Sequence, residues 1–182
     1  MKYMKPYLLV GYNRVRFCLK KIRVPQFEAT GIQMFGRNTK ICFRKKSTVH
    51  FGDRIISDGR MVIIVDDNAK LFIGDRTYFN EDAMISCKGM IKIGEGCKFG
   101  PNVKIFDNNH KYDVVNGVSD EHNVGKIMIG EHCWIGANSV ILKGAKIGPN
   151  CVIGAGCIIS GEIPENSVVT QGRELTIKPM RE

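Results

Sequence analysis

The sequence predicts an all-β protein, a parallel β-helix of hexapeptide repeats, and two observations lead to this prediction. Between residues 129 and 164 isoleucine recurs at every sixth position, and a small residue follows four positions after most of these isoleucines. Six residues fit one flat side of a three-sided prism, so three repeats close one coil of about 18 residues. An α-helix cannot use this pattern, because a period of six drifts around its 3.6 residues per turn. The recurring isoleucines are Ile129, Ile135, Ile141, Ile147, Ile153 and Ile159.

Each position of the repeat has an expected place in the coil. The isoleucine should point into the prism and stack on its counterpart in the next coil. The small residue, such as Cys133 or Ser139, should also point inward, where a corner leaves little room. Glycine follows the isoleucine at positions 130, 136, 148 and 154. We expect these glycines at turns whose positive φ favours a residue without a side chain.

The other segments are predicted from where the repeat is clear and where it breaks. Residues 1–30 should form a short, irregular, basic cap, since Pro6 and Gly11 interrupt their roughly helical spacing. Residues 31–172 should form a β-helix of about five coils, with irregular early coils up to residue 72. Residues 107–126 are polar and interrupt the repeat without changing its phase, which predicts an extruded loop. We expect residues 173–182 to form a C-terminal tail.

The net charge of +9 is concentrated near the N-terminus. Residues 1–50 hold 12 Lys or Arg residues and one acidic residue, Glu28. One interpretation is a cap that protects the open end of the solenoid. The other is a surface for peripheral contact with an anionic membrane, or for a phosphate-bearing substrate. No recognised nucleic-acid motif accompanies the charge, so we expect no nucleic-acid partner.

The seven cysteines show no C-x-x-C spacing of the kind found in zinc and redox sites. Those at 97, 133, 151 and 157 occupy the small inward position and should be buried hydrophobic side chains, not nucleophiles. An odd number of buried thiols indicates a reducing compartment. The longest apolar run near the start, residues 7–12, is too short for a membrane span or a signal peptide. We therefore expect a cytoplasmic protein.

A family resemblance is carried by residues 134–156, which read W-I-G-A-N-S-V-I-L-K-G-A-K-I-G-P-N-C-V-I-G-A-G. This segment resembles the hexapeptide-repeat acyltransferases, and among them the galactoside, maltose and capsular-polysaccharide sugar O-acetyltransferases. The resemblance covers roughly residues 70–172. It implies a left-handed coil, acetyl-CoA as co-substrate, no metal, and a homotrimer with active sites between subunits.

The resemblance assigns catalysis to His110. This residue lies in D-N-N-H-K-Y-D, 24 residues before Trp134, which is the family's spacing between its catalytic base and the tryptophan of W-I-G. A sugar hydroxyl needs a base that removes its proton as it attacks a thioester, and histidine suits this work. The backbone N–H of Ala137 is the expected donor to the oxyanion. The predicted function is direct acetyl transfer from acetyl-CoA to a sugar hydroxyl in bacterial cell-surface polysaccharide synthesis.

Binding residues are also implied by the resemblance. Asn80 matches a substrate-contacting asparagine, while Lys88 stands where close relatives carry an acidic residue, which leaves the acceptor sugar open. Trp134 matches a residue that flanks the acceptor and packs along the pantetheine arm of CoA. Gly161 and residues 172–176 depart from the family pattern at the nucleotide end of CoA. The implied CoA-binding positions are Trp134, Gly136, Ala137, Ala155, Ser160 and Lys178, with Lys143, Lys146 and Arg173 as alternatives for the phosphate contact.

Other functions stay open at this point. The same fold and base could acetylate the amino group of a nucleotide-linked amino sugar. A second enzymatic alternative is acylation of an antibiotic or of an amino acid such as serine. The altered tail also allows a non-catalytic β-helix scaffold. A zinc site like that of the γ-class carbonic anhydrases is not expected, because no two histidines have the required five-residue spacing.

Overall fold

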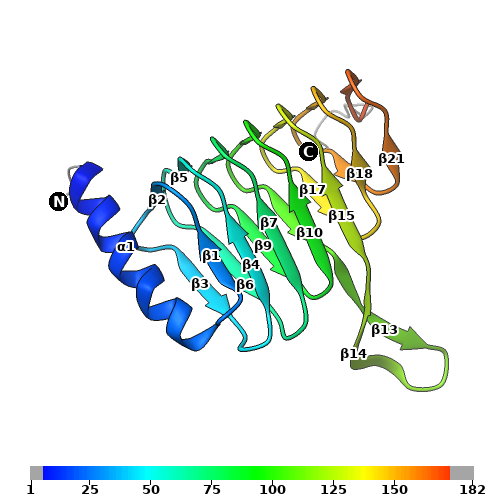
Figure 1. The fold of residues 1–182 in the computed structure, drawn as a ribbon. Coiled ribbons are helices and arrows are strands. Elements are labelled where there is room, and N and C mark those ends of the chain that lie inside the picture. The colour runs from blue at the N-terminus through cyan, green and yellow to red at the C-terminus, as the bar shows by residue number, and fades with distance from the viewer. Residues whose placement is uncertain (1–5, 173–182) are drawn as a thin grey trace, which may run out of the picture.

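The computed structural model describes residues 6–172 of the 182-residue chain. They form a single helix, α1 (Pro6–Arg23), followed by a three-sided parallel β-helix. Figure 1 shows α1 lying across one end of the solenoid, with the coils stacked away from it toward β21. The predicted fold class, a left-handed parallel β-helix of hexapeptide repeats, is confirmed. Within the described residues, no helix is long and apolar enough to span a membrane.

Three parallel sheets, here called faces A, B and C, form the sides of the prism, and each coil passes through them in that order. Face A consists of β1 (Phe27–Ala29), β4 (Thr48–Phe51), β7 (Lys70–Ile73), β10 (Met90–Ile93), β15 (Lys126–Ile129), β18 (Lys146–Ile147) and β21 (Glu162–Ile163). Face B consists of β2 (Gln33–Phe35), β5 (Ile55–Ser57), β8 (Tyr78–Phe79), β11 (Lys98–Phe99), β16 (Trp134–Ile135), β19 (Val152–Ile153) and β22 (Val168–Val169). Face C consists of β3 (Lys40–Phe43), β6 (Val62–Val65), β9 (Met84–Cys87), β12 (Lys104–Phe106), β17 (Val140–Leu142) and β20 (Ile158–Ile159).

The interior of the prism contains the residues that the repeat places there. The isoleucines of the repeat are buried, and so are the small residues four positions after them. A hydrogen bond with the Cys133 thiol, together with burial, raises the pKa of the Cys97 thiol well above its usual range, and the Cys97 Sγ donates to the carbonyl oxygen of Gly130 at 3.1 Å. The cysteines at the small inward positions of the repeat therefore act as small packing groups.

The glycines of the repeat have a different physical reason from the predicted one. The positive φ angles lie two positions further along, at residues such as His132, Asn138 and Asn150. Gly130 is required because a Cβ there would lie 2.4 Å from the backbone nitrogen of Pro149 in the next coil. The absent side chain thus permits adjacent coils to approach, and the turn itself uses other residues.

The early coils are regular, contrary to prediction, but each is longer than three hexapeptides. This follows from the strand register on face A, where Phe27 pairs with Val49 and Val49 pairs with Leu71. Near the C-terminus, Ile129 pairs with Ile147 after three hexapeptides, and Ile147 pairs with Ile163 after slightly less than three. The seven strands of face A also show more coils than the five predicted. A search for a period of six misses the early coils because their sides do not all have the length of one hexapeptide.

The wide coils are filled by phenylalanine. Phe17 of α1 packs edge-on against Phe27, Phe35 and Phe51, with ring centroids 5.3 to 5.9 Å apart. Edge-to-face rings at this separation attract each other beyond the gain from burial. This aromatic cluster fixes α1 on the first coils.

The N-terminal cap is a regular helix, which corrects the irregular cap predicted from Pro6 and Gly11. Pro6 occupies the first helical position, where its missing N–H costs nothing. Three inward-facing side chains of α1 donate hydrogen bonds to backbone carbonyls of the first coil: Asn13 to Phe35 at 2.9 Å, Arg16 to Thr39 at 2.5 Å and Lys20 to Ile41 at 2.8 Å. The unpaired edge of the sheet is therefore covered and its acceptors are satisfied.

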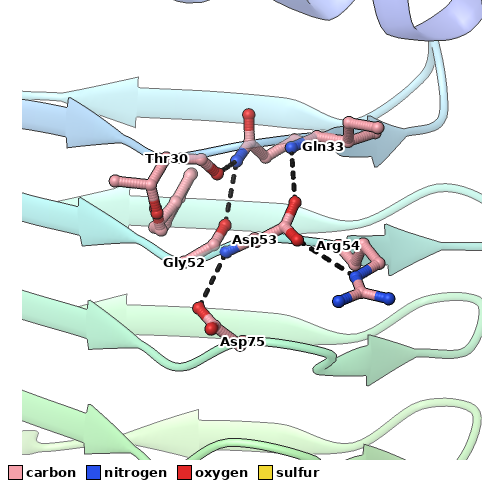
Figure 2. Close-up of polar contacts among 8 residues, drawn as sticks. Thr30, Gln33, Gly52, Asp53, Arg54 and Asp75 are labelled. Carbon is pink, nitrogen blue, oxygen red and sulfur yellow. Dashed lines mark hydrogen bonds and ion pairs between the residues drawn. The ribbon is translucent and has the colours of Figure 1, made fainter.

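Aspartates connect successive coils at the corner between faces A and B (Figure 2). The carboxylate of Asp75 accepts a hydrogen bond from the Asp53 backbone N–H at 2.8 Å, and the carboxylate of Asp53 accepts one from Ile32 at 2.8 Å. That bond from Ile32 lowers the pKa of Asp53. Gln33, buried beside this corner, donates to the Gly52 carbonyl at 2.9 Å. Each coil is thus held to the next by side chains as well as by the strand ladder.

We expect Gly130→Ala to lower the free energy of unfolding by about 1–3 kcal/mol, because the added methyl group must push two coils apart. Thermal or denaturant unfolding measures this change. Gly11→Ala is the matched control: it lies in α1 with no atom within 4 Å of the added Cβ, so it should be neutral or stabilise by up to about 1 kcal/mol. Equal stability of the two variants would contradict the close-approach explanation.

Candidate active site

The segment predicted to be an extruded loop is a β-hairpin. Strands β13 (Asn108–Asp113) and β14 (Gly117–Val124) pair in antiparallel fashion, with an irregularity between His110 and Tyr112. Figure 1 shows the hairpin projecting from the solenoid between β12 and β15, which places it at the corner between faces C and A. The side chains along it are mostly exposed.

Asp107 anchors this hairpin to the solenoid. Its carboxylate is fully buried and accepts hydrogen bonds from the backbone N–H groups of Lys88 and Gly89, each at 2.8 Å. Its backbone carbonyl accepts from Gly125 at 2.8 Å, where the chain returns from the hairpin. One residue therefore fixes both ends of the hairpin to the coil below. The side chain of Lys88 forms an ion pair with Asp66.

His110 is held in a defined tautomer. Its Nδ1 lies 2.9 Å from the backbone carbonyl oxygen of Ser119 on the opposite strand. A carbonyl oxygen can only accept, so Nδ1 must carry the proton and the neutral ring keeps its lone pair on Nε2. His122, the cross-strand partner, lies against the ring with centroids 4.2 Å apart and the planes at 40°. The arrangement leaves an exposed imidazole that can accept a proton at Nε2.

The corner between faces B and C brings together most of the other predicted site residues. Asn80, Gly136 and Gly154 occupy equivalent positions in separate coils, since the backbone bonds run from Asn80 to Phe99 and from Gly136 to Ile153. Ala137 and Ala155 directly follow two of these positions, and a hydrogen bond from Gly156 to the Ala137 carbonyl links their coils at 2.8 Å. Among residues 6–172, the backbone N–H groups of Ala137 and Ala155 have no hydrogen-bond partner. This corner therefore offers two free donors to a ligand.

Trp134 lies in the same coil as Ala137, whereas Asn80 lies two coils before it along the same corner. Trp134 points outward from face B between Lys98 and Val152, with 55% of its surface exposed. Asn80 is half-buried, and its Oδ1 accepts the N–H of Glu81 at 2.7 Å, as in an ordinary turn. Its amide nitrogen forms no hydrogen bond within the described part of the chain. A substrate contact by Asn80 stays a prediction.

Within one chain the predicted site residues fall into two groups. His110 and Ser160 lie at the corner between faces C and A, whereas Asn80, Gly136, Ala137 and Ala155 lie at the corner between faces B and C. Face C separates the two groups. Lys178 and the tail 173–182 lie outside the described residues. A single chain therefore does not assemble the predicted site.

Two residues of the site were missed by the sequence reasoning. Asp107 could have been noticed as an acidic residue at the break of the repeat, next to the D-N-N-H motif. His122 could not, because only the hairpin register brings it opposite His110. A separate cluster of Glu95, Glu131 and His132 lies at the corner between faces A and B, where Arg76 forms an ion pair with Glu95 at 3.0 Å.

Known proteins share this architecture. Residues 126–161 match the family described as bacterial transferase hexapeptide (six repeats). The chain is 26% identical over 151 residues to the putative lipopolysaccharide biosynthesis O-acetyl transferase WbbJ of Escherichia coli, covering 75% of this chain and 77% of that protein. Other curated relatives, galactoside O-acetyltransferases among them, are matched over only about half of their own length.

Two solved structures show the same fold. One is the hexapeptide-repeat acetyltransferase VCA0836 of Vibrio cholerae with acetyl coenzyme A, with a TM-score of 0.53 at 20% identity, covering 86% of this chain and 71% of that one. The other is a mutant of AntD, an N-acyltransferase from Bacillus cereus, with dTDP-4-amino-4,6-dideoxyglucose and coenzyme A. Its TM-score is 0.63 at 15% identity, with 91% of this chain and 90% of that one covered.

The stacked coils and the hexapeptide repeat define a class of solenoid transferases. Residues 126–161 carry the hexapeptide repeat of that bacterial transferase family, and the fold resembles that of a hexapeptide-repeat acetyltransferase, in line with the sequence resemblance.

We expect Asp107→Ala to lower the free energy of unfolding by about 1–3 kcal/mol, because the backbone N–H groups of residues 88 and 89 lose their acceptor. Hydrogen exchange should also become faster in the hairpin amides. Asp113→Ala is the matched control, since Asp113 accepts from two backbone N–H groups, of Val115 and Asn116, in an exposed turn where water can replace it. Unchanged exchange in Asp107→Ala would refute the anchoring role.

Proposed function

We propose that this protein transfers an acetyl group from acetyl-CoA to a hydroxyl group on a sugar, with His110 as general base. The observation that carries the proposal is the hydrogen bond from Nδ1 of His110 to the Ser119 carbonyl. It leaves the lone pair on Nε2, where a base must have it. The O-acetyl transferase name of the Escherichia coli relative supports the reaction class.

The chemistry requires one base and one oxyanion donor. Nε2 of His110 removes the hydroxyl proton as the sugar oxygen attacks the thioester carbonyl carbon. The carbonyl oxygen gains negative charge, and the free N–H of Ala137 is a suitable donor to it. When the tetrahedral species collapses, the C–S bond breaks and the proton returns from His110 to the CoA sulfur. The products are an acetylated sugar and free CoA, without an acyl-enzyme.

The corner between faces B and C suits the pantetheine arm of CoA. This arm contains amide groups, and the free N–H groups of Ala137 and Ala155 can pair with its carbonyl oxygens. The exposed ring of Trp134 offers an apolar surface beside them. The solved relatives with bound acetyl-CoA or CoA support this class of co-substrate.

A homotrimer would bring the two groups of site residues together. The outward side of face C is mostly apolar, with Lys40, Ser86 and Lys104 as its polar members, and we propose that it turns toward a threefold axis. Its two edges would then meet the opposite edges of neighbouring chains, as closed cyclic symmetry requires. His110 of one chain would lie beside Ala137 and Ala155 of the next. The outward apolar residues of face C are Val62, Ile64, Met84, Phe106, Val140, Leu142 and Ile158.

Val140→Asp should therefore dissociate the assembly and abolish activity, because it places a carboxylate in the apolar contact. Sedimentation equilibrium of the purified protein measures the mass. Met128→Asp is the matched control, since Met128 is an equally half-buried outward residue of face A, and it should leave the mass unchanged. A trimer that survives Val140→Asp would show that face C is not the contact.

His110→Ala should lower the rate of acetyl transfer by about 10²–10⁴-fold while leaving acetyl-CoA affinity unchanged, since the base acts only in the chemical step. Calorimetric titration with acetyl-CoA and a thiol-release assay measure the two quantities. His50→Ala is the control, because His50 lies on face A and pairs with Glu28 at 3.6 Å. Full activity in His110→Ala, or no acetyl-CoA binding by the wild type, would overturn the proposal and favour a scaffold.

The main alternative to this reaction is acetylation of an amino group on the acceptor sugar. AntD is an N-acyltransferase with a nucleotide-linked amino sugar bound, so the same fold serves nitrogen nucleophiles. A panel of hydroxyl and amino sugars, free and carrier-linked, separates the two reactions. We favour the hydroxyl and a role in bacterial cell-surface polysaccharide synthesis because of the similarity to WbbJ. The seven unpaired cysteines favour a cytoplasmic setting.

A further inference from the structure

Helix α1 has an exposed apolar side that points away from the solenoid. Leu8, Tyr12, Val15, Leu19 and Ile22 are between 39% and 77% exposed. Their alternating spacing of four and three residues places them along one side of the helix, here called the apolar stripe. The opposite side carries Asn13 and Phe17, which are buried against the first coil. The stripe therefore belongs to the outer surface of the cap.

Exposed cations lie around the helix from the apolar stripe. At about 100° per residue, Arg23 lies beside the stripe, whereas Arg14 and Lys21 lie on the other side of it, further round toward the buried side, and all three are exposed. Their head groups form no hydrogen bond or ion pair with any other residue between 6 and 172. Helix α1 contains no acidic residue. Unlike Arg16 and Lys20, which cover carbonyls of the first coil, these three cations are available to a partner.

We propose that the apolar stripe docks α1 flat on a membrane surface that contains anionic lipids. A helix with large apolar residues on one side and cations beside them lies at the head-group boundary, with its apolar side among the acyl chains. Each cation near such a surface strengthens binding roughly fivefold at modest salt. The charges disfavour a second copy of α1 as the occupant, because it would set unpaired cations against cations.

The position of α1 suits this contact. Figure 1 shows the helix across the end of the solenoid, so the outer side of α1 faces away from all the coils. In the trimer proposed above, three such stripes would lie at the same end if the solenoid axes run parallel to the threefold axis. Simultaneous contacts would raise the affinity far above that of one helix. This step rests on the proposed assembly, whereas docking by one helix does not.

The docking also bears on the acceptor of the proposed reaction. The hairpin with His110 leaves the solenoid after β12, the fourth strand of face C counted from α1. Coils are about 4.8 Å apart and helix α1 adds a thickness of about 10 Å, so the base would lie roughly 25 Å from the membrane. A sugar attached directly to a lipid phosphate would not reach that height easily. The geometry favours a lipid-linked oligosaccharide whose distal sugar is acetylated.

Vesicle flotation tests the docking. The probes are vesicles of phosphatidylcholine alone and of phosphatidylcholine mixed with phosphatidylglycerol. Wild-type protein should float with the mixed vesicles and not with the neutral ones. The variant Leu19→Gln with Ile22→Gln should lose at least tenfold in partitioning while keeping the helix, because glutamine is a good helix former. Arg14→Gln with Lys21→Gln should also weaken binding and reduce its dependence on salt.

The control removes two exposed apolar side chains from elsewhere. Val114→Gln with Val115→Gln changes two exposed valines at the hairpin tip and should float like the wild type. Wild-type protein that stays unbound, or equal flotation of the stripe variant, would overturn the proposal. A fall in oligomer mass in Leu19→Gln with Ile22→Gln would show a subunit contact and overturn it as well. Acetyl-CoA binding by the wild type, measured in parallel by calorimetry, does not depend on docking, so its absence would count against the proposed function and not against the docking.

Discussion

Close approach of successive coils is the constraint on which this structure depends. The strands of each face must lie within hydrogen-bonding distance of the next coil, about 4.8 Å away. Because the corners connect these strands, the corners of successive coils have the same separation. A Cβ at Gly130 would lie 2.4 Å from one backbone nitrogen, and a Cβ at Gly136 2.6 Å from another. Glycine at these corners therefore permits the backbone hydrogen bonds between the strands of successive coils. At one such corner the Asp75 carboxylate accepts the N–H of Asp53, whereas the equivalent N–H groups of Ala137 and Ala155 have no partner within residues 6–172.

The part of the fold that could be predicted from sequence is the part where each side of the prism is one hexapeptide. There the buried isoleucines, the small inward residues and the coil repeat all followed from the period. The regular N-terminal coils could not be predicted, because coils longer than three hexapeptides do not repeat with a constant period of six residues. Helix α1 could not be predicted from Pro6 and Gly11, because its stability depends on the packing of Phe17 into an aromatic cluster whose other members are distant in sequence.

The candidate site shows a similar division. The spacing between His110 and Trp134 pointed to the residues, but their arrangement depends on tertiary structure. The tautomer of His110 is fixed by a carbonyl on another strand, and the hairpin position is fixed by Asp107, whose buried carboxylate holds residues 88 and 89. No local pattern encodes such partners. Only the stacked coils reveal that the predicted site residues occupy two edges of face C, which is why the proposed site includes a neighbouring chain.

The coils shorten along the solenoid, from the pairing of Phe27 with Val49 near α1 to that of Ile147 with Ile163 near β21, and this gives the molecule a direction. Parallel sheets with open ends invite further strands to add. Here a second molecule placed end to end would have to match a wide perimeter to a narrow one, leaving part of the larger coil without a partner. The corners would fall out of line, and the glycines that permit close approach would no longer face each other. Tapering thus discourages fibre growth along the solenoid axis, independently of the helix that covers one end.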